Sequence, residues 1–429
     1  MHPSPNLTSD LSLISPSPSK SNFTDALLVL RAFACFMVVV IHCSPPRNSI
    51  LFHGVDLSWI IFSHGCVAVW IFFCLSGYLM GKAFYSGRYR LNWQGAFNFW
   101  RNRALRILPL YGFTILVLSI LVYPEILKLE SWGILLRIFT FTYQPYLSSQ
   151  PLNFNGVVWS LSTEVQFYLL VPFLYAIFKR YCLKHHHVWL AIIAVLLTIF
   201  SFKLTIWMIL HQEINHKMEY VFRYWYAPLV TNLDVFLIGF LMNPLLCTLQ
   251  KPTKEHSVNS ISPTHFKFLT PRFYKLLAIA LIGLLYLFTA HHFYHQELWN
   301  SPERGIQGFR TTTTIFILQP LTALVTAYFI FAFEVNAPST PLPKLSPDAI
   351  LQNPYRCLEI FGHLSYGVYL WHLPIIQKIT PIFTSAVPIE AFYLRLKATL
   401  ILSLILATVT YYTVELPSAR WKSYRQSKT

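Results

Sequence analysis

Apolar runs separated by short polar segments recur along almost the whole chain. A run of about 17–25 mostly apolar residues is long enough to cross a bilayer as a helix. The sequence contains about ten such runs, at 25–42, 57–80, 106–123, 157–178, 188–210, 227–248, 274–293, 312–333, 357–377 and 393–413. A further apolar stretch at 132–142 is too short to span and contains Arg137, so we expect an interfacial or re-entrant segment there. The pattern predicts an all-α, polytopic membrane helix bundle with about ten transmembrane helices.

Polar segments flank this predicted membrane domain at both ends. Residues 1–24 are rich in Ser, Pro and Asn and lack an apolar core, so we expect a disordered cytoplasmic head rather than a signal peptide. Residues 25–413 contain all the apolar runs, and residues 414–429 form a basic cytoplasmic tail. Because the sequence ends soon after the last run, we expect any chemistry to take place within the membrane domain.

Composition and charge agree with this class of protein. Hydrophobic residues make up 55% of the chain and charged residues 12%, against about 25% charged residues in ordinary soluble domains. The formal net charge of +16 could indicate nucleic-acid binding, but the basic residues lie between the apolar runs, so topology explains them and no nucleic-acid partner is expected. Most of them fall in alternate connecting segments, and the positive-inside rule therefore places both termini in the cytoplasm. The seven cysteines form no C-x-x-C pair, and no metal site is predicted.

An ionisable residue lies at each end of the apolar core of the first predicted helix, in the segment RAFACFMVVVIH at 31–42. Eleven helical steps bring His42 to within about 20° of Arg31 around the helix and about 16 Å further along its axis. Both side chains therefore share one face, and exposing that face to lipid would be costly. This favours a polar interior. The alternative is that Arg31 snorkels to the interface and His42 is an ordinary interfacial residue.

The fourth predicted helix places Glu164 about 10 Å below the outer surface, within NGVVWSLSTEVQFYLLVP. Its polar neighbours are Ser160, Ser162, Thr163 and Gln166. A carboxylate beside an imidazole can fix the tautomer and stabilise the imidazolium that forms when the ring accepts a proton. We therefore interpret His42 and Glu164 as a catalytic pair. The alternative is a structural ion pair between Glu164 and Arg31.

Two arginines one helical turn apart, Arg103 and Arg106, open the third predicted helix in FWRNRALRILPLY. Guanidinium groups on one face suit phosphate oxygens. The preceding helix ends in FFCLSGYLMG, where the small residues Ser76 and Gly77 would let a ligand approach the backbone. These features indicate a phosphate site on the cytoplasmic side, although a positive-inside flank accounts for the charge equally well.

A third polar cluster lies in FGHLSYGVYLWH, at 361–372. Spacings of three and four residues let its polar members share a face: Ser365, Tyr366, Tyr369 and His372. One interpretation is that these residues line the site. For the tyrosines the alternative is that they anchor the helix at the membrane–water interface. Asp234 could join the same cavity, whereas Glu415 is expected to cap a helix end near the basic tail.

Taken in order, these segments resemble the acyltransferase-3 family of integral-membrane O-acyltransferases. The matching positions are Arg31 and His42; Leu75 to Tyr78; Arg103, Arg106 and Ile107 to Tyr111; Trp159 to Leu169; Ser365 to His372; and Tyr411, Val414, Glu415 and Pro417. Two positions depart from many relatives, because Trp70 and Val165 stand where those carry acidic residues. Glu164 is consequently the only acid in its motif.

The resemblance implies a ten-helix domain that moves an acyl group, usually acetyl, from cytoplasmic acyl-CoA to a hydroxyl. The acceptor is often a sugar of a lipid-linked or cell-surface glycan, such as lipopolysaccharide O-antigen, capsule or peptidoglycan, and the expected location is the inner membrane of a bacterium. On this interpretation His42 and Glu164 are catalytic. The expected donor-binding residues are Arg31, Arg103, Arg106 and Ser76, and the expected acceptor-binding residues are Ser162, Tyr366, Tyr369, His372 and Asp234. Acyl-CoA would act as a co-substrate, with no permanently bound cofactor.

Buried Arg, Glu and His residues would also suit a proton-coupled transporter or flippase. Carriers commonly consist of two related halves, and the sequence contains no such internal repeat. A purely structural membrane subunit is a further alternative, but it would not require so many convergent polar groups.

Overall fold

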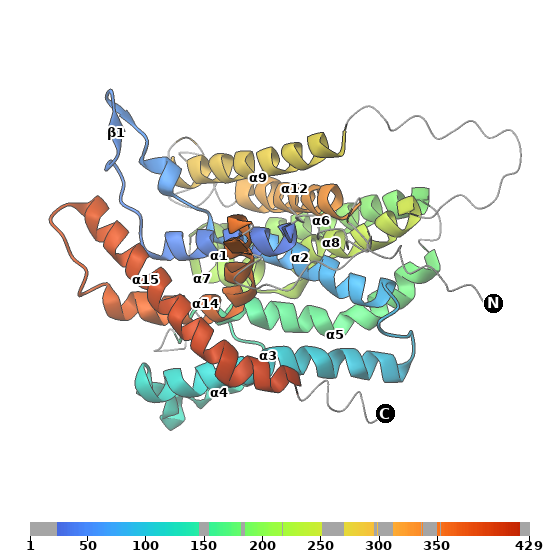
Figure 1. Cartoon of the computed structure of the whole chain (residues 1–429), viewed down its shortest axis with the longest axis horizontal. Helices are drawn as coiled ribbons and strands as arrows, with labels where there is room; N and C mark the ends of the chain where they lie inside the picture. The colour runs from blue at the N-terminus through green and yellow to red at the C-terminus, as the bar shows by residue number, and fades with distance from the viewer. Residues whose placement is uncertain are drawn as a thin grey trace, which may run out of the picture.

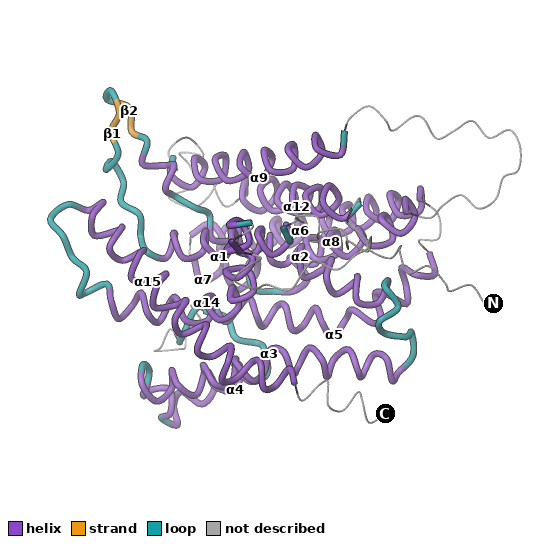
Figure 2. Tube along the Cα trace, in the orientation of Figure 1, coloured by secondary structure: helices purple, strands orange, loops and turns teal. Residues whose placement is uncertain are grey.

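The computed structural model describes residues 24–145, 154–181, 185–216, 218–250, 270–295, 298, 312–335, 337, 350–351 and 353–420. Helices make up most of this part of the chain (Figure 1). The strands within it form one small hairpin that projects from the bundle near α9 (Figure 2).

The main helices follow one another as α1 Ala26–His42, α2 Gly65–Tyr85, α3 Trp93–Leu121, α4 Trp132–Phe139, α5 Val158–Tyr181, α6 His185–His216, α7 Met218–Val221, α8 Leu229–Gln250, α9 Pro271–Tyr294, α12 Gln319–Glu334, α14 Cys357–Ile379 and α15 Pro388–Thr410. Short 3₁₀ turns are η1 Ser58–Ile61, η2 Pro124–Leu127, η3 Leu129–Ser131 and η8 Pro354–Arg356. Single π-helical turns are η4 Phe222–Tyr226, η7 Thr314–Leu318 and η9 Tyr411–Glu415. The hairpin pairs β1 Leu51–Phe52 with β2 Val55–Asp56.

The predicted all-α architecture is confirmed, and each predicted apolar run coincides with a helix. Among the described residues, 8 helices are long and apolar enough to cross a membrane. The helix α1, with 17 residues, is shorter than these spans. The helix α14 is not among the eight, and it carries the polar residues Glu359, His363, His372 and Lys378. The segment at 132–142 forms the eight-residue helix α4, too short to span, as predicted.

Helices α1 and α14 run parallel and in close contact. The backbone N–H of Asp25 donates to Glu359 Oε1 at 2.9 Å near the start of both helices. A Cβ atom on Gly362 would lie 2.2 Å from the carbonyl oxygen of Leu28, so only glycine permits this approach. The parallel course brings the C-terminal part of each helix to the same end of the bundle.

Helices α2 and α8 are joined by a similar close crossing. A Cβ atom on Gly77 would lie 2.0 Å from the Phe236 carbonyl oxygen, and one on Gly239 would lie 2.0 Å from the Cys74 carbonyl oxygen. Phe73 and Phe236 stack across the same crossing at 4.5 Å between ring centroids. These contacts fix the position of α2, which contributes residues to the candidate site along its length.

Candidate functional site

Two histidines from α1 and α14 meet at one end of the bundle. The Nε2 atom of His372 lies 3.2 Å from Nδ1 of His42, with ring centroids 5.1 Å apart. Each Nδ1 atom also contacts a carbonyl oxygen of its own helix: His42 Nδ1 is 2.9 Å from Val38 O, and His372 Nδ1 is 2.7 Å from Tyr369 O. His372 is completely buried, whereas His42 is only partly buried.

These contacts assign the tautomers of both rings. A carbonyl oxygen only accepts hydrogen bonds, so Nδ1 of each ring carries the proton and donates it to its own helix. Nε2 of His372 is then a lone-pair acceptor that can share the Nδ1 proton of His42. In the neutral ring of His42 the Nε2 atom is then unprotonated, as a general base or nucleophile requires.

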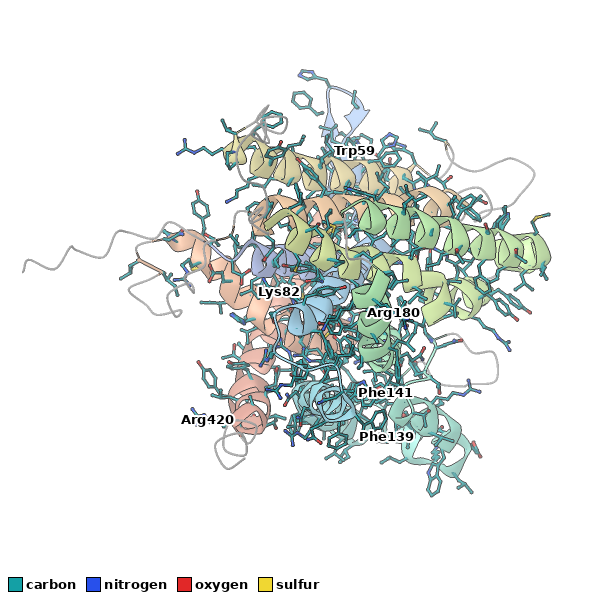
Figure 3. The ribbon with its side chains drawn as sticks, turned by 90° about the vertical axis from the view of Figure 1, so that its right-hand side faces the viewer. Trp59, Lys82, Phe139, Phe141, Arg180 and Arg420 are labelled. Atoms are coloured by element: carbon teal, nitrogen blue, oxygen red, sulfur yellow. The ribbon has the colours of Figure 1, made fainter. Side chains whose placement is uncertain are left out.

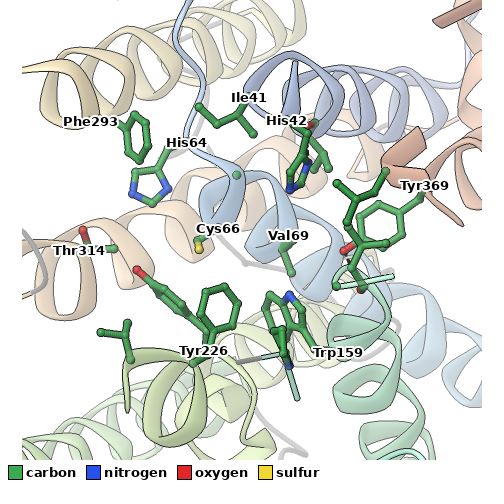
Figure 4. A pocket seen from close by; sticks show the side chains of 18 of the residues that line it. Ile41, His42, His64, Cys66, Val69, Trp159, Tyr226, Phe293, Thr314 and Tyr369 are labelled. Atoms are coloured by element: carbon green, nitrogen blue, oxygen red, sulfur yellow. Dashed lines mark hydrogen bonds between the residues drawn. The ribbon is translucent and has the colours of Figure 1, made fainter. Parts of the chain in front are cut away.

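His42 lines a cavity of about 340 Å³, the histidine cavity. Its described lining comprises Val38, Ile41, His42, His64, Gly65, Cys66, Val69, Pro145, Gly156, Val157, Trp159, Val221, Phe222, Tyr226, Phe293, Thr314, Tyr369, Leu373 and Gln377. His42 and His64 project from one side, and Trp159 and Tyr226 from the opposite side (Figure 4). The π-helical turns η4 and η7 supply part of the wall, and such turns frequently mark functional sites.

A second cavity of about 390 Å³, the basic cavity, lies where α2 ends and α3 begins. Its cationic lining residues are Arg31, Lys82, Arg88, Arg103 and Arg106. Lys82 lies at the end of the bundle that faces the reader in Figure 3. Within the part of the chain that the structure describes, the buried Nε atoms of Arg31 and Arg103 have no hydrogen-bond partner, and neither residue forms an ion pair. These guanidinium groups are available to an anionic ligand.

Glu164 faces the basic cavity from α5. Ser76 Oγ and the Tyr168 hydroxyl both donate to Glu164 Oε1. A small cavity of about 60 Å³, the middle cavity, lies beside this cluster; its lining includes Arg31, Ser76, Glu164, Tyr366 and Tyr369. It shares several residues with the basic cavity, and shares Val69 and Tyr369 with the histidine cavity. The three cavities thus form a series from the basic cluster to His42.

The prediction that His42 and Glu164 contact each other is wrong. Among the described residues, Glu164 hydrogen-bonds to Ser76 and Tyr168, and the partners of His42 are Val38 and His372. The reason is that α5 turns Glu164 toward the basic cavity. Glu164 and Arg31 do not form the direct ion pair that was the alternative expectation. Their two charges are nevertheless close enough to interact electrostatically.

Three of the expected acceptor-binding residues line none of the three cavities described above. Asp234 forms a buried ion pair with Lys203, which also donates to Gln319 Oε1 at 2.9 Å. It borders a separate cavity between α6, α8 and α12. Ser162 is buried and faces the Val158 carbonyl oxygen of its own helix. Neither residue lines the histidine, middle or basic cavity, and the same is true of the buried His372, which contacts His42 instead.

The other predicted donor- and acceptor-binding residues line the series of cavities. Tyr366 and Tyr369 both line the middle cavity, and the Tyr366 hydroxyl donates to the Ile107 carbonyl oxygen at 3.0 Å. Trp70, which stands where many relatives carry an acidic residue, donates from Nε1 to Asn232 Oδ1 at 3.0 Å. Glu415, which we expected to cap a helix end, is close enough to Arg106 and Arg31 to interact electrostatically with both.

Tyr168 and His64 are among the cavity residues that sequence reasoning missed. Tyr168, which holds Glu164, lies four residues later on the same helix face, so its spacing was a usable signal. His64 comes just before α2, within the predicted apolar run 57–80, but nothing in that run indicates which residues it faces, and only the fold brings it to the histidine cavity.

Comparison with known proteins identifies relatives across the membrane domain. The chain is 24% identical to the O-acetyltransferase OatA of Staphylococcus aureus (strain NCTC 8325 / PS 47) over 403 residues, which cover 90% of this chain and 56% of OatA. It is 25% identical over 406 residues to YrhL of Bacillus subtilis (strain 168), whose name proposes peptidoglycan O-acetylation, covering 90% of this chain and 54% of YrhL. The chain is also 26% identical to the acyltransferase MdmB of Streptomyces mycarofaciens over 179 residues, which cover 36% of this chain and 40% of MdmB.

The chain therefore spans about half the length of OatA and YrhL. No solved structure matches it significantly. The family model described as "Acyltransferase domain" matches residues 25–412. This match includes every cavity residue named above, and the chain therefore belongs to the acyltransferase-3 family of membrane O-acyltransferases.

Proposed function

We propose that this enzyme transfers an acyl group, most simply acetyl, from acyl-CoA to a hydroxyl of a carbohydrate. The observation that carries the proposal is the series of cavities that begins at unpaired guanidinium groups and ends at an imidazole with a free Nε2 atom. The names of OatA and YrhL support acetyl as the acyl group and a cell-wall glycan as one candidate acceptor.

The donor's phosphates fit the basic cavity. Coenzyme A carries a diphosphate and a further phosphate, and Arg88, Arg103 and Arg106 present forked donors that suit these oxygens. The pantetheine arm would pass the middle cavity between Ser76 and Tyr366 and carry the thioester toward His42. Arg31 lies about 16 Å from His42 along α1, a distance that suits contact with the donor arm better than with the reacting carbonyl.

His42 would act as the general base. Its Nε2 atom takes the proton of the acceptor hydroxyl as the hydroxyl oxygen bonds to the thioester carbonyl carbon. The carbon–sulfur bond then breaks, and the departing thiolate takes the proton from the imidazolium. Throughout, the Nδ1–H group of His42 stays held by Val38 O and His372 Nε2. Attack by Nε2 itself, which would give an acyl-imidazole before transfer, uses the same geometry.

The distribution of charge suggests the direction of transfer. By the positive-inside rule the basic cavity would open to the cytoplasm, where acyl-CoA is made, and the histidine cavity would lie toward the outer face. The acceptor would then react near the outer surface of the membrane. We propose the bacterial inner membrane as the location, in line with the bacterial origin of the relatives named above.

The proposal is tested with purified protein in lipid nanodiscs and acetyl-CoA labelled in the acetyl group. Hydroxylamine serves as a minimal acceptor, and the two products, acetohydroxamic acid and free CoA, are both measured. We expect transfer by the wild type, loss of at least about 100-fold in His42→Ala, and no loss in His53→Asn, whose residue is exposed at the hairpin tip. Full transfer by His42→Ala would contradict the proposal. No transfer by the wild type, together with flux of a glycan across the membrane, would indicate a carrier.

A further inference from the structure

The histidine cavity and the basic cavity differ sharply in charge. The described lining of the histidine cavity contains no Lys, Arg, Asp or Glu, and its ionisable groups there are His42, His64, Cys66 and tyrosines. Five cationic residues, by contrast, surround the basic cavity. A carboxylate or phosphate that entered the histidine cavity would lose its water without gaining a Lys or Arg partner from this lining, which is strongly unfavourable.

Aromatic rings form the wall of the histidine cavity that faces His42. Trp159 and Phe222 meet edge to face at 5.7 Å between centroids, and Phe222 and Tyr226 do so at 5.2 Å. Figure 4 shows Trp159 and His42 on opposite sides of the space. Tyr226 follows Phe222 by four residues in the turn η4, so one turn of backbone sets both rings on this wall. Packed aromatic rings offer a fixed, apolar surface to a ligand at low entropic cost.

From these two observations we infer that the histidine cavity binds a neutral, saturated ring bearing the reactive hydroxyl. A pyranose without carboxylate or phosphate on the ring fits this description, with its C–H face on Trp159 and Phe222 and its hydroxyl toward His42. A volume of about 340 Å³ is at the small end of ligand sites, so it accommodates one ring rather than an extended oligosaccharide. Charged parts of a larger acceptor stay outside the cavity. This inference rests on the proposed function, since it assigns the acceptor side of the same reaction.

Matched sugars that differ only in charge test the inference. Methyl glycosides of uronamides and of the corresponding uronates, in the gluco, galacto and manno configurations, are added to the hydroxylamine assay as competitors. We expect at least one uronamide to compete, and its uronate to bind at least about tenfold more weakly. Equal competition by a uronate, stronger competition by a uronate, or competition by neither class would overturn the inference.

A matched pair of variants locates the binding surface. Phe222→Leu keeps an apolar side chain but removes the aromatic face, and we expect it to raise the inhibition constant of the uronamide about tenfold. Phe52→Leu makes the same change at an exposed hairpin position and should leave that constant unchanged. An unchanged constant in Phe222→Leu would contradict the assigned wall.

Titration calorimetry separates this inference from the proposed function. Binding of the uronamide and uronate requires no turnover, so the preference of the cavity is measured even if acyl transfer is not found. Selective binding of the neutral sugar without transfer would refute the proposed function alone, whereas transfer together with equal binding of both sugars would refute this inference alone.

Discussion

His372 Nε2 accepts the Nδ1 proton of His42 across 3.2 Å, so an imidazole occupies the position expected for a carboxylate. A neutral ring in this position is itself buried and bonded to the Tyr369 carbonyl oxygen. It can stabilise the imidazolium of His42 during transfer without placing a permanent charge beside an apolar cavity. We therefore expect His372 to position His42, and Glu164 to act on the donor side of the site.

Replacing His372 should slow transfer without weakening donor binding. In His372→Ala the Nδ1–H group of His42 loses one acceptor, and a hydrogen bond to a charged group contributes about 1.5–3 kcal/mol. We expect kcat to fall about 10- to 100-fold while KM for acetyl-CoA stays unchanged. His372→Gln, whose side-chain oxygen can accept, should recover part of kcat. His363→Gln on the exposed face of the same helix serves as the control. A change in KM alone would assign His372 to substrate binding instead.

Replacing the basic-cavity arginines should weaken donor binding selectively. Each of Arg103→Ala and Arg106→Ala removes a charge-assisted contact to phosphate, so we expect KM for acetyl-CoA to rise about tenfold or more. With acetyl-pantetheine, which lacks the phosphates, both variants should match the wild type. Arg101→Ala removes a neighbouring arginine that does not line the cavity and should leave KM unchanged. An equal loss with both donors would argue against a phosphate site.

Removing Asp234 should destabilise the protein rather than alter acceptor use. Asp234→Leu leaves Lys203, a residue that is 2% exposed, without its carboxylate partner. Breaking a buried ion pair on one side costs about 3–5 kcal/mol. We expect a lower thermal midpoint in detergent for Asp234→Leu and substantial recovery in the double variant with Lys203→Leu. An unchanged midpoint with a raised KM for the acceptor would restore the substrate-binding role expected from the sequence.

Adding one methyl group at Gly77 should disturb the crossing of α2 and α8. The new Cβ atom of Gly77→Ala would lie 2.0 Å from the Phe236 carbonyl oxygen, and backbone must move to relieve the contact. Overpacking of this kind costs about 1–3 kcal/mol. We expect a lower thermal midpoint and weaker donor binding, because the adjacent Ser76 would shift. Gly112→Ala, with nothing within 4 Å of its new Cβ atom, is the matched control. Equal midpoints for the two variants would contradict the close packing.

The elements of this fold could be predicted because the length and apolarity of a run determine whether it can cross a membrane as a helix. The shared face of Arg31 and His42 could also be predicted, since both lie on one helix. Contacts between helices could not. His42 and His372 are 330 positions apart, and periodicity does not state which polar faces meet. For the same reason the partner of Asp234 was not foreseen: Lys203 lies within an apolar run whose sequence does not reveal that it faces α8.

A structure with a bound, non-reactive thioether analogue of acetyl-CoA tests the central claim most directly. Determined by cryo-electron microscopy in nanodiscs, it should place the phosphates beside Arg103 and Arg106, the pantetheine arm past Ser76, and the sulfur within about 4 Å of His42 Nε2. Phosphates bound elsewhere, or an arm that stops in the basic cavity with the sulfur far from His42, would contradict this account.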